Sequence, residues 1–205
     1  MRSRTSTQQA RRGLLALAAL TVPITLVVLF AFTWRGADPT PAPVSDVGSD
    51  VAHGAYLVQT HVCNDCHTPW KMGPNGPEPD MTRMLSGHPQ DVILPPPPDV
   101  GTSGWGMISS ATNTAFAGPW GISYARNLTP DPTGLGSWTE EMFVKALRTG
   151  WHMGVENSRR IMPPMPWQSF GQMTDEELHD VFLYLKSIPP IHNQVPENVM
   201  ATTGG

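Results

Sequence analysis

Apolar and polar residues follow different patterns along the chain, and the longest apolar run lies near the N-terminus. Residues 13–34 contain no charged side chain. As a helix this run would extend over about 33 Å, close to the thickness of the hydrocarbon core of a bilayer. Residues 1–12 carry four arginines and no acidic residue, and such a basic flank usually stays in the cytoplasm. We therefore expect a basic cytoplasmic tail at 1–12 and a single transmembrane anchor at 13–34.

A signal peptide is the alternative interpretation of the same segment. Its apolar region would usually be about 7–15 residues long, shorter than the run observed here. Either interpretation orients the rest of the chain in the same way. The expected location is the bacterial inner membrane, crossed once, with the larger part of the chain on the periplasmic side.

The first helix expected beyond this segment runs towards Val62 and is capped by Ser49 or Asp50. Gly54 lies inside it, where glycine costs about 1 kcal/mol relative to alanine. A close crossing with another helix would explain a glycine at this position. We expect that crossing to involve the last helix, near Tyr184.

Two further helices are indicated in the second half of the chain. One begins after Ser137 or Thr139, both of which are good N-caps, and ends at Gly150. The other begins at Thr174, and Glu177 completes a capping box. In the last helix, apolar residues recur at the spacing i, i+3, i+4 and i+7 that forms one buried face: Leu178, Val181, Phe182 and Leu185.

Proline and glycine dominate the connections between these helices. The chain contains 22 Pro and 19 Gly without any repeating period, which indicates long ordered loops. We expect a linker at 35–48, a helical domain at 49–196 with a Pro/Gly-rich insertion at about 71–116, and a C-terminal tail at 197–205. The insertion is expected to border the functional site, to meet a partner, or to be disordered. The predicted fold class is all-α, preceded by the transmembrane helix.

Charge is distributed unevenly along the chain. From Gly36 onward there are eight Lys and Arg residues against seventeen Asp and Glu residues. An acidic domain argues against binding to nucleic acid, whose phosphates call for a basic surface. It favours basic protein partners, because opposite charges steer the encounter.

The two cysteines of the chain lie in one short motif, which carries the candidate chemistry. Cys63, Cys66 and His67 form the pattern C-x-x-C-H, which is typical of covalent haem c attachment. The two thiols reach the two vinyl groups on one edge of a porphyrin, and the adjacent imidazole then binds the iron. A disulfide across so short a loop would stabilise the fold little.

Two alternative interpretations of the motif are possible. A thioredoxin-like redox pair requires a βαβ context, and the sequence around the motif does not predict one. A structural zinc site requires four nitrogen or sulfur ligands, and His61 could supply the fourth. Zinc does not require this order of residues, so the haem interpretation is preferred.

A second iron ligand is expected in the loop between the last two helices. Methionine sulfur opposite histidine suits electron transfer, because it raises the reduction potential. Met165 is flanked by prolines, which stiffen the backbone, and is favoured over Met162. His88 or His152 is a lesser option. The methionines considered in this region are Met153, Met162, Met165 and Met173.

Three stretches of the chain together resemble a known family. Residues 54–70, 117–154 and 162–196 are similar in order and content to class I c-type cytochromes. Within these they resemble the cytochrome domains of membrane-bound quinoprotein alcohol dehydrogenase subunits. Those subunits carry three such domains on one chain, each with its own C-x-x-C-H, whereas this chain has one.

The resemblance implies particular roles for individual residues. The methionine of the MPW segment is the distal iron ligand in such proteins, which corresponds to Met165. The NLTP segment lies along the haem in such proteins. By this analogy the residues expected to line the pocket are Trp120, Asn127, Leu128, Pro130 and Trp167.

These observations predict a one-electron carrier and not an enzyme. One covalent haem c would have its iron held by His67 and Met165, with no open position for substrate. The expected partners are a dehydrogenase, a quinol-oxidising complex or a terminal oxidase, and the membrane through the N-terminal helix. The alternative is a haem-based enzyme subunit or gas sensor whose distal ligand can be displaced.

Overall fold

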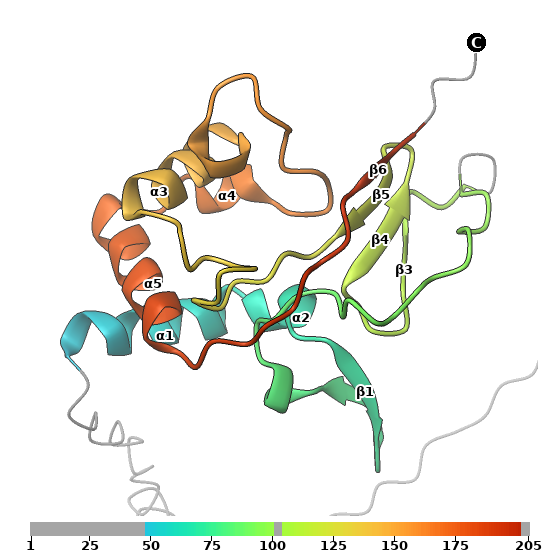
Figure 1. Cartoon of the computed structure of the whole chain (residues 1–205), viewed down its shortest axis with the longest axis horizontal. Helices are drawn as coiled ribbons and strands as arrows, with labels where there is room; N and C mark the ends of the chain where they lie inside the picture. Colours follow the sequence, from blue (N-terminus) through green and yellow to red (C-terminus); the bar gives the residue numbers. More distant parts are fainter. Residues whose placement is uncertain (1–47, 101–103, 202–205) are drawn as a thin grey trace, which may run out of the picture. The chain divides into compact units, whose positions relative to one another are not determined.

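The computed structural model describes residues 48–100 and 104–201, which lie in the second of two compact units, residues 44–205. Helices and strands both occur in this part of the chain (Figure 1). The helices are α1 (Ser49–Thr60), α2 (Cys63–His67), α3 (Glu140–Thr149), α4 (Trp167–Phe170) and α5 (Asp175–Ser187), with short 3-10 turns at Met81–Arg83 and His152–Gly154.

Helices α1 and α5 pack against each other (Figure 1), and they approach most closely at Gly54. A Cβ atom at this glycine would collide with the backbone oxygen of Asp180 and would lie 3.0 Å from the Cβ of Tyr184. The crossing expected from the sequence is therefore confirmed. It brings the apolar faces of the first and last helices together in the core.

Replacing Gly54 by Ala is expected to lower the free energy of unfolding by about 3 kcal/mol, because the added methyl group meets backbone that cannot move aside cheaply. The gain of about 1 kcal/mol in helix propensity is smaller. Chemical denaturation measures the change. Gly106→Ala is the control, since a Cβ there meets nothing within 4 Å. An equal effect of both substitutions would contradict the close crossing.

The predicted ends of the helices are mostly confirmed. Thr174 and Glu177 form the capping box of α5. Of the two possible caps of α3, Thr139 accepts a hydrogen bond from Met142 N, and Gly150 ends this helix with a φ of 72°. The prediction for α1 is wrong in detail, because its N-cap is Gly48 and no side chain caps it.

The hydrophobic core lies between α1, α3 and α5. Its members come from one face of each helix and from the segments around Leu85, Leu135 and Ile188. They include Leu57, Val58, Leu85, Leu135, Phe143, Leu178, Val181, Phe182, Leu185 and Ile188. The aromatic rings of Phe143 and Phe182 meet at 5.6 Å between centroids and join α3 to α5.

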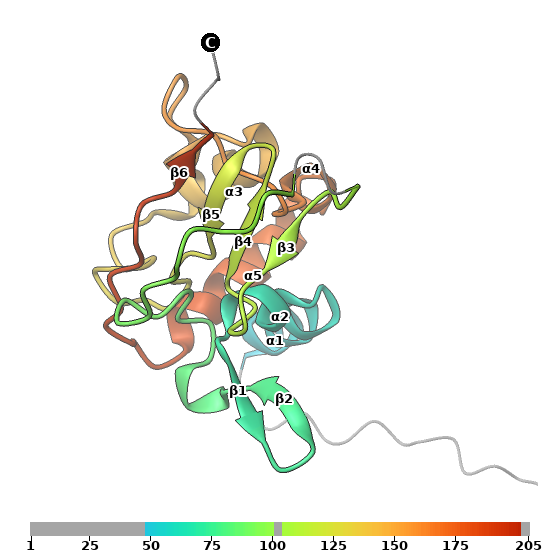
Figure 2. The ribbon, with the colours of Figure 1, turned by 90° about the vertical axis from the view of Figure 1, so that its right-hand side faces the viewer.

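The prediction of an all-α fold is wrong, because two antiparallel sheets accompany the helices. Strands β1 (Trp70–Gly73) and β2 (Gly76–Pro79) form a hairpin. Strands β3 (Ile108–Ser109), β4 (Ala115–Gly118), β5 (Gly121–Tyr124) and β6 (Val199–Met200) form a sheet in that order (Figure 2). Strands this short show too few alternating positions to be recognised from the sequence.

Much of the sheet structure falls within the segment 71–116, which the sequence predicted as a long insertion. Its described residues contain β2, β3 and parts of β1 and β4. His88 is buried here, and its ring nitrogens hydrogen-bond to Thr114 Oγ1 at 2.9 Å and to the oxygen of Val92 at 3.1 Å. These bonds occupy both nitrogens with structural partners.

The prediction of a membrane-spanning helix, and with it the single-pass membrane location, is corrected by the structure. In the described part of the chain, no helix is both long and apolar enough to cross a bilayer. The segment 13–34, on which the prediction depended, and the neighbouring ranges 1–12 and 35–47 lie outside the described residues.

Candidate functional site

A cavity of about 800 Å³ lies in the domain and contains the C-x-x-C-H motif in its wall. Its walls come from four helices, α1, α2, α3 and α5, and from the segments 123–138, 152–166 and 194–198. Further lining residues are Met107, Asn113, Phe116, Phe170 and Met173. Most of the lining is apolar, as in sites that bind organic cofactors, and the volume lies within the range of ~300–1,000 Å³ usual for such sites.

The motif is presented to the cavity by an abrupt turn between α1 and α2. Val62 has a φ of 53°, an uncommon conformation for a β-branched residue. Beyond it Cys63, Cys66 and His67 all line the cavity. Thr68 holds the end of this turn, because its hydroxyl donates to Asn64 Oδ1 and accepts from the backbone of Leu85.

His67 is oriented by a hydrogen bond to the backbone. Its Nδ1 lies 2.8 Å from the carbonyl oxygen of Arg126. A carbonyl only accepts, so the proton is on Nδ1 and Nε2 keeps its lone pair. Burial lowers the pKa of His67, and the bond to Arg126 only partly opposes this. A neutral imidazole fixed through Nδ1 is the usual state of a metal-binding histidine.

The environment of the two cysteines disfavours the alternative interpretations of the motif. Burial raises the pKa of Cys63 to about 11 and also raises that of Cys66. Redox-active pairs instead contain a thiol with a lowered pKa. His61 lines the same cavity, but its Nδ1 lies 3.0 Å from the oxygen of Leu57.

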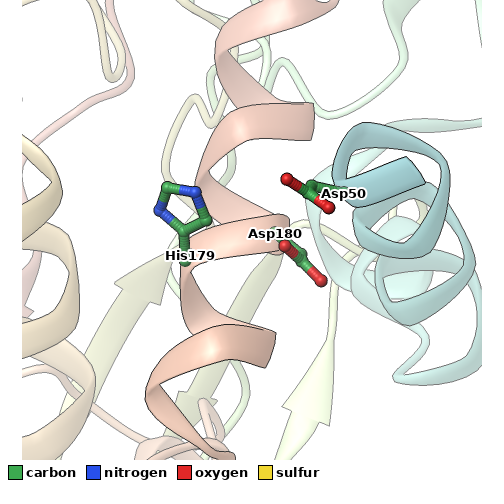
Figure 3. A group of neighbouring side chains, drawn as sticks. All are labelled: Asp50, His179 and Asp180. Atoms are coloured by element: carbon green, nitrogen blue, oxygen red, sulfur yellow. The ribbon is translucent and has the colours of Figure 1, made fainter. Parts of the chain in front are cut away.

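Among the described residues, one group of three metal-ligating side chains brings its ligand atoms within 4.8 Å of one another, and it lies outside the motif: Asp50, His179 and Asp180 (Figure 3). Cys63, Cys66 and His67 therefore do not form a zinc cluster with His61. In the group of Asp50, His179 and Asp180, the Nδ1 atom of His179 lies 2.9 Å from a carboxylate oxygen of Glu140. A carboxylate oxygen of Asp180 lies 2.7 Å from Nδ1 of His53. Ion pairs between helices account for His179 and Asp180, and Asp50 accepts a hydrogen bond from Ser49 Oγ.

All four candidate methionines border the cavity: Met153, Met162, Met165 and Met173. The backbone around Met165 is the most constrained. Its N–H bonds the oxygen of Met162 at 3.3 Å, and its own oxygen accepts from Trp167 N at 2.9 Å. Ser123 Oγ also donates to the oxygen of Pro163 at 2.5 Å, which ties this loop to β5. The backbone that carries the Met165 side chain is thus fixed at the cavity wall.

The other residues predicted for the pocket divide into two sets. Asn127 and Leu128 line the cavity, whereas Trp120, Pro130 and Trp167 do not belong to its lining. Asn127 also holds the chain together, since its Nδ2 donates to the oxygen of Ile191 at 2.8 Å. Trp167 packs on Gly150, and Trp120 packs on Gly118.

The sequence reasoning missed the charged residues of the cavity wall. Arg126, Arg159 and Glu197 all line it, next to His152, which the sequence did indicate as a lesser candidate for an iron ligand. Burial is the main cause that lowers the pKa of His152, to about 4, with Arg159 and Arg126 adding to the effect. The Arg159-Arg160 pair just before the methionine-rich loop was the available signal.

A cofactor-sized apolar cavity with a C-x-x-C-H turn at one wall and methionine sulfurs in a constrained loop is typical of a c-type cytochrome domain. Comparison with curated proteins points to the same class. No family model matches the chain.

Three relatives illustrate the similarity. The cytochrome subunit of fructose dehydrogenase from Gluconobacter japonicus is 27% identical over 85% of this chain and 29% of its own length. The cytochrome c subunit of alcohol dehydrogenase (quinone) from Gluconobacter oxydans is 31% identical over 38% and 17%. A nicotinate dehydrogenase subunit from Pseudomonas putida is 33% identical over 46% and 8%.

The resemblance inferred from the motifs is thus confirmed: the chain is similar to cytochrome c subunits of dehydrogenases. It spans less than a third of the length of each of these three relatives.

Proposed function

We propose that this chain is a one-electron carrier with a single haem c attached through Cys63 and Cys66. His67 Nε2 and the sulfur of Met165 would hold its iron. The observation that carries the proposal is the bond from His67 Nδ1 to the oxygen of Arg126 at 2.8 Å, inside a cavity that both cysteines border. It leaves one imidazole nitrogen available for a metal.

The residues present suit the cofactor in chemistry as well as in volume. The bound haem supplies an iron that changes between two oxidation states. The raised pKa of these half-buried thiols keeps them protonated, which slows competing oxidation. The apolar wall, from Leu57, Phe143 and Leu185 among others, excludes water and favours the less charged, reduced state.

Electron transfer is favoured over substrate chemistry because two axial ligands would leave the iron without an open position. The protein residues then act by holding geometry: Arg126 through its carbonyl on one side, and the Met162–Trp167 turn on the other. A dehydrogenase is the proposed electron donor, since the similar proteins are dehydrogenase subunits. A quinol-oxidising complex is the other proposed donor, and a terminal oxidase is the proposed acceptor.

Visible spectra of the purified, matured protein test this function. We expect the bands of a low-spin haem c in both redox states, a mass raised by one covalently bound haem, and little binding of carbon monoxide to the reduced protein at neutral pH. Rapid and complete binding of carbon monoxide would instead favour an enzyme subunit or gas sensor. Colourless protein with the mass of the bare polypeptide would refute haem attachment altogether.

A further inference from the structure

The cavity wall contains two guanidinium groups whose donors are not fully used. Among the described residues that line it, Arg126 and Arg159 are the cationic ones. They approach from different segments, since Arg126 follows β5 and Arg159 precedes the methionine loop. Both face the same carboxylate, Glu197, at 3.1 Å from Arg126 Nη2 and at 4.0 Å from Arg159 Nε.

Arg159 is the less satisfied of the two. Its side chain is 35% exposed, and within the described part of the chain its guanidinium has the 4.0 Å ion pair with Glu197 and no hydrogen bond. A guanidinium carries five N–H donors. Burial lowers the pKa of Arg159, and the nearby Arg126 lowers it further. This environment therefore calls for additional negative charge.

Arg126 has a related deficit at a different atom. Its two Nη atoms are occupied, by the oxygen of Pro196 at 3.1 Å and by Glu197. Its Nε is buried and has no hydrogen-bond partner among the described residues. A buried donor without a partner is uncommon in folded proteins and calls for an explanation. Because this nitrogen is buried from the cavity as well, Arg126 would meet a ligand there through its Nη groups.

We propose that Arg159 and Arg126 form a binding site for the two propionate groups of the haem, an inference that rests on the proposed function. In a porphyrin attached to Cys63 and Cys66 by its vinyl groups, the propionates are on the edge away from that attachment. Two carboxylates need charged donors if they are removed from water, and arginine binds carboxylates through paired hydrogen bonds. One Glu197 carboxylate cannot neutralise both guanidinium groups.

The arrangement also gives these arginines an effect on the reduction potential. A positive charge near the haem disfavours the oxidised state, which carries one more positive charge than the reduced state. Arg126 acts twice, because its carbonyl also orients His67. His67 is oriented by Arg126 and not by Arg159. Substitution of Arg159 therefore tests the charge of the guanidinium alone.

The test uses haem-loaded Arg159→Gln. We expect the ratio of reduced to oxidised protein at a fixed solution potential to fall about tenfold, equivalent to about 59 mV for one electron. The propionate bending modes in the resonance Raman spectrum should shift as well. Arg159→Lys keeps the charge and loses the paired geometry, so it should retain most of the potential but still shift these modes. Arg126→Lys is the corresponding variant at the second position.

Arg83→Gln is a closely matched control. Its side chain is 33% exposed and makes a 4.0 Å ion pair with Asp91, but it does not line the cavity. Equal shifts for Arg83→Gln and Arg159→Gln, or unchanged propionate modes in every variant, would overturn the inference while leaving the electron carrier intact. Absence of attached haem in the unmodified protein would overturn both.

Discussion

Replacing both Cys63 and Cys66 by Ala is expected to abolish covalent haem attachment. No other thiol of the chain can replace them, because Cys63 and Cys66 are the two cysteines of the sequence. Denaturing electrophoresis with haem staining should show no band for the double variant, against a strong band for the unmodified protein. The single variants should retain less haem than the unmodified protein, because one bond remains possible in each.

The same substitution is expected to destabilise the fold strongly. Without the haem, the apolar walls of this cavity would meet water and lose the group they pack against, and this lost burial counts against the ~5–15 kcal/mol that usually stabilises a domain. We therefore expect loss of a cooperative thermal transition, measured by circular dichroism. Asp65→Asn, at the exposed position between the cysteines, should keep both haem and transition. A haem-stained band in the double variant would contradict the proposed attachment.

Features encoded by neighbouring residues could be predicted from the sequence. The capping box of α5 depends on Thr174 and Glu177, which are three positions apart. The C-x-x-C-H turn depends on five consecutive residues. Gly54 is an intermediate case. The free-energy cost of a glycine inside a helix indicated a close contact, but the residues in contact, Asp180 and Tyr184, belong to the distant helix α5. In each case local chemistry determined the prediction.

The sheets and the charged wall of the cavity could not be predicted in this way. Strand β6 contains two residues and pairs with β5 across 77 to 79 positions of the chain, from Ile122↔Val199 to Gly121↔Met200, so its partner leaves no periodic signal. Arg126, Arg159 and Glu197 meet only because three loops converge at one wall. Their charges had no visible function until the cavity identified a ligand that would need them.

The sulfur of Met165 is the proposed distal ligand, and Met165→Ala is expected to open the iron. Removing the sulfur should permit rapid carbon monoxide binding to the reduced protein. It should also lower the reduction potential, by at least the ~59 mV that corresponds to a tenfold change, because methionine opposite histidine favours the reduced state. Equilibrium redox titration and carbon monoxide difference spectra measure the two effects.

Met162→Ala is the decisive comparison, because both sulfurs border the cavity and both residues belong to the same turn. The backbone of Met165 is held on both sides, through its N–H to Met162 and through its oxygen to Trp167. A ligand whose backbone is already fixed loses less conformational entropy when its sulfur binds. Met162→Ala should therefore change packing and leave carbon monoxide binding low. If Met162→Ala opens the iron and Met165→Ala does not, the sulfur ligand is Met162 and the proline-flanked position serves only to shape the loop.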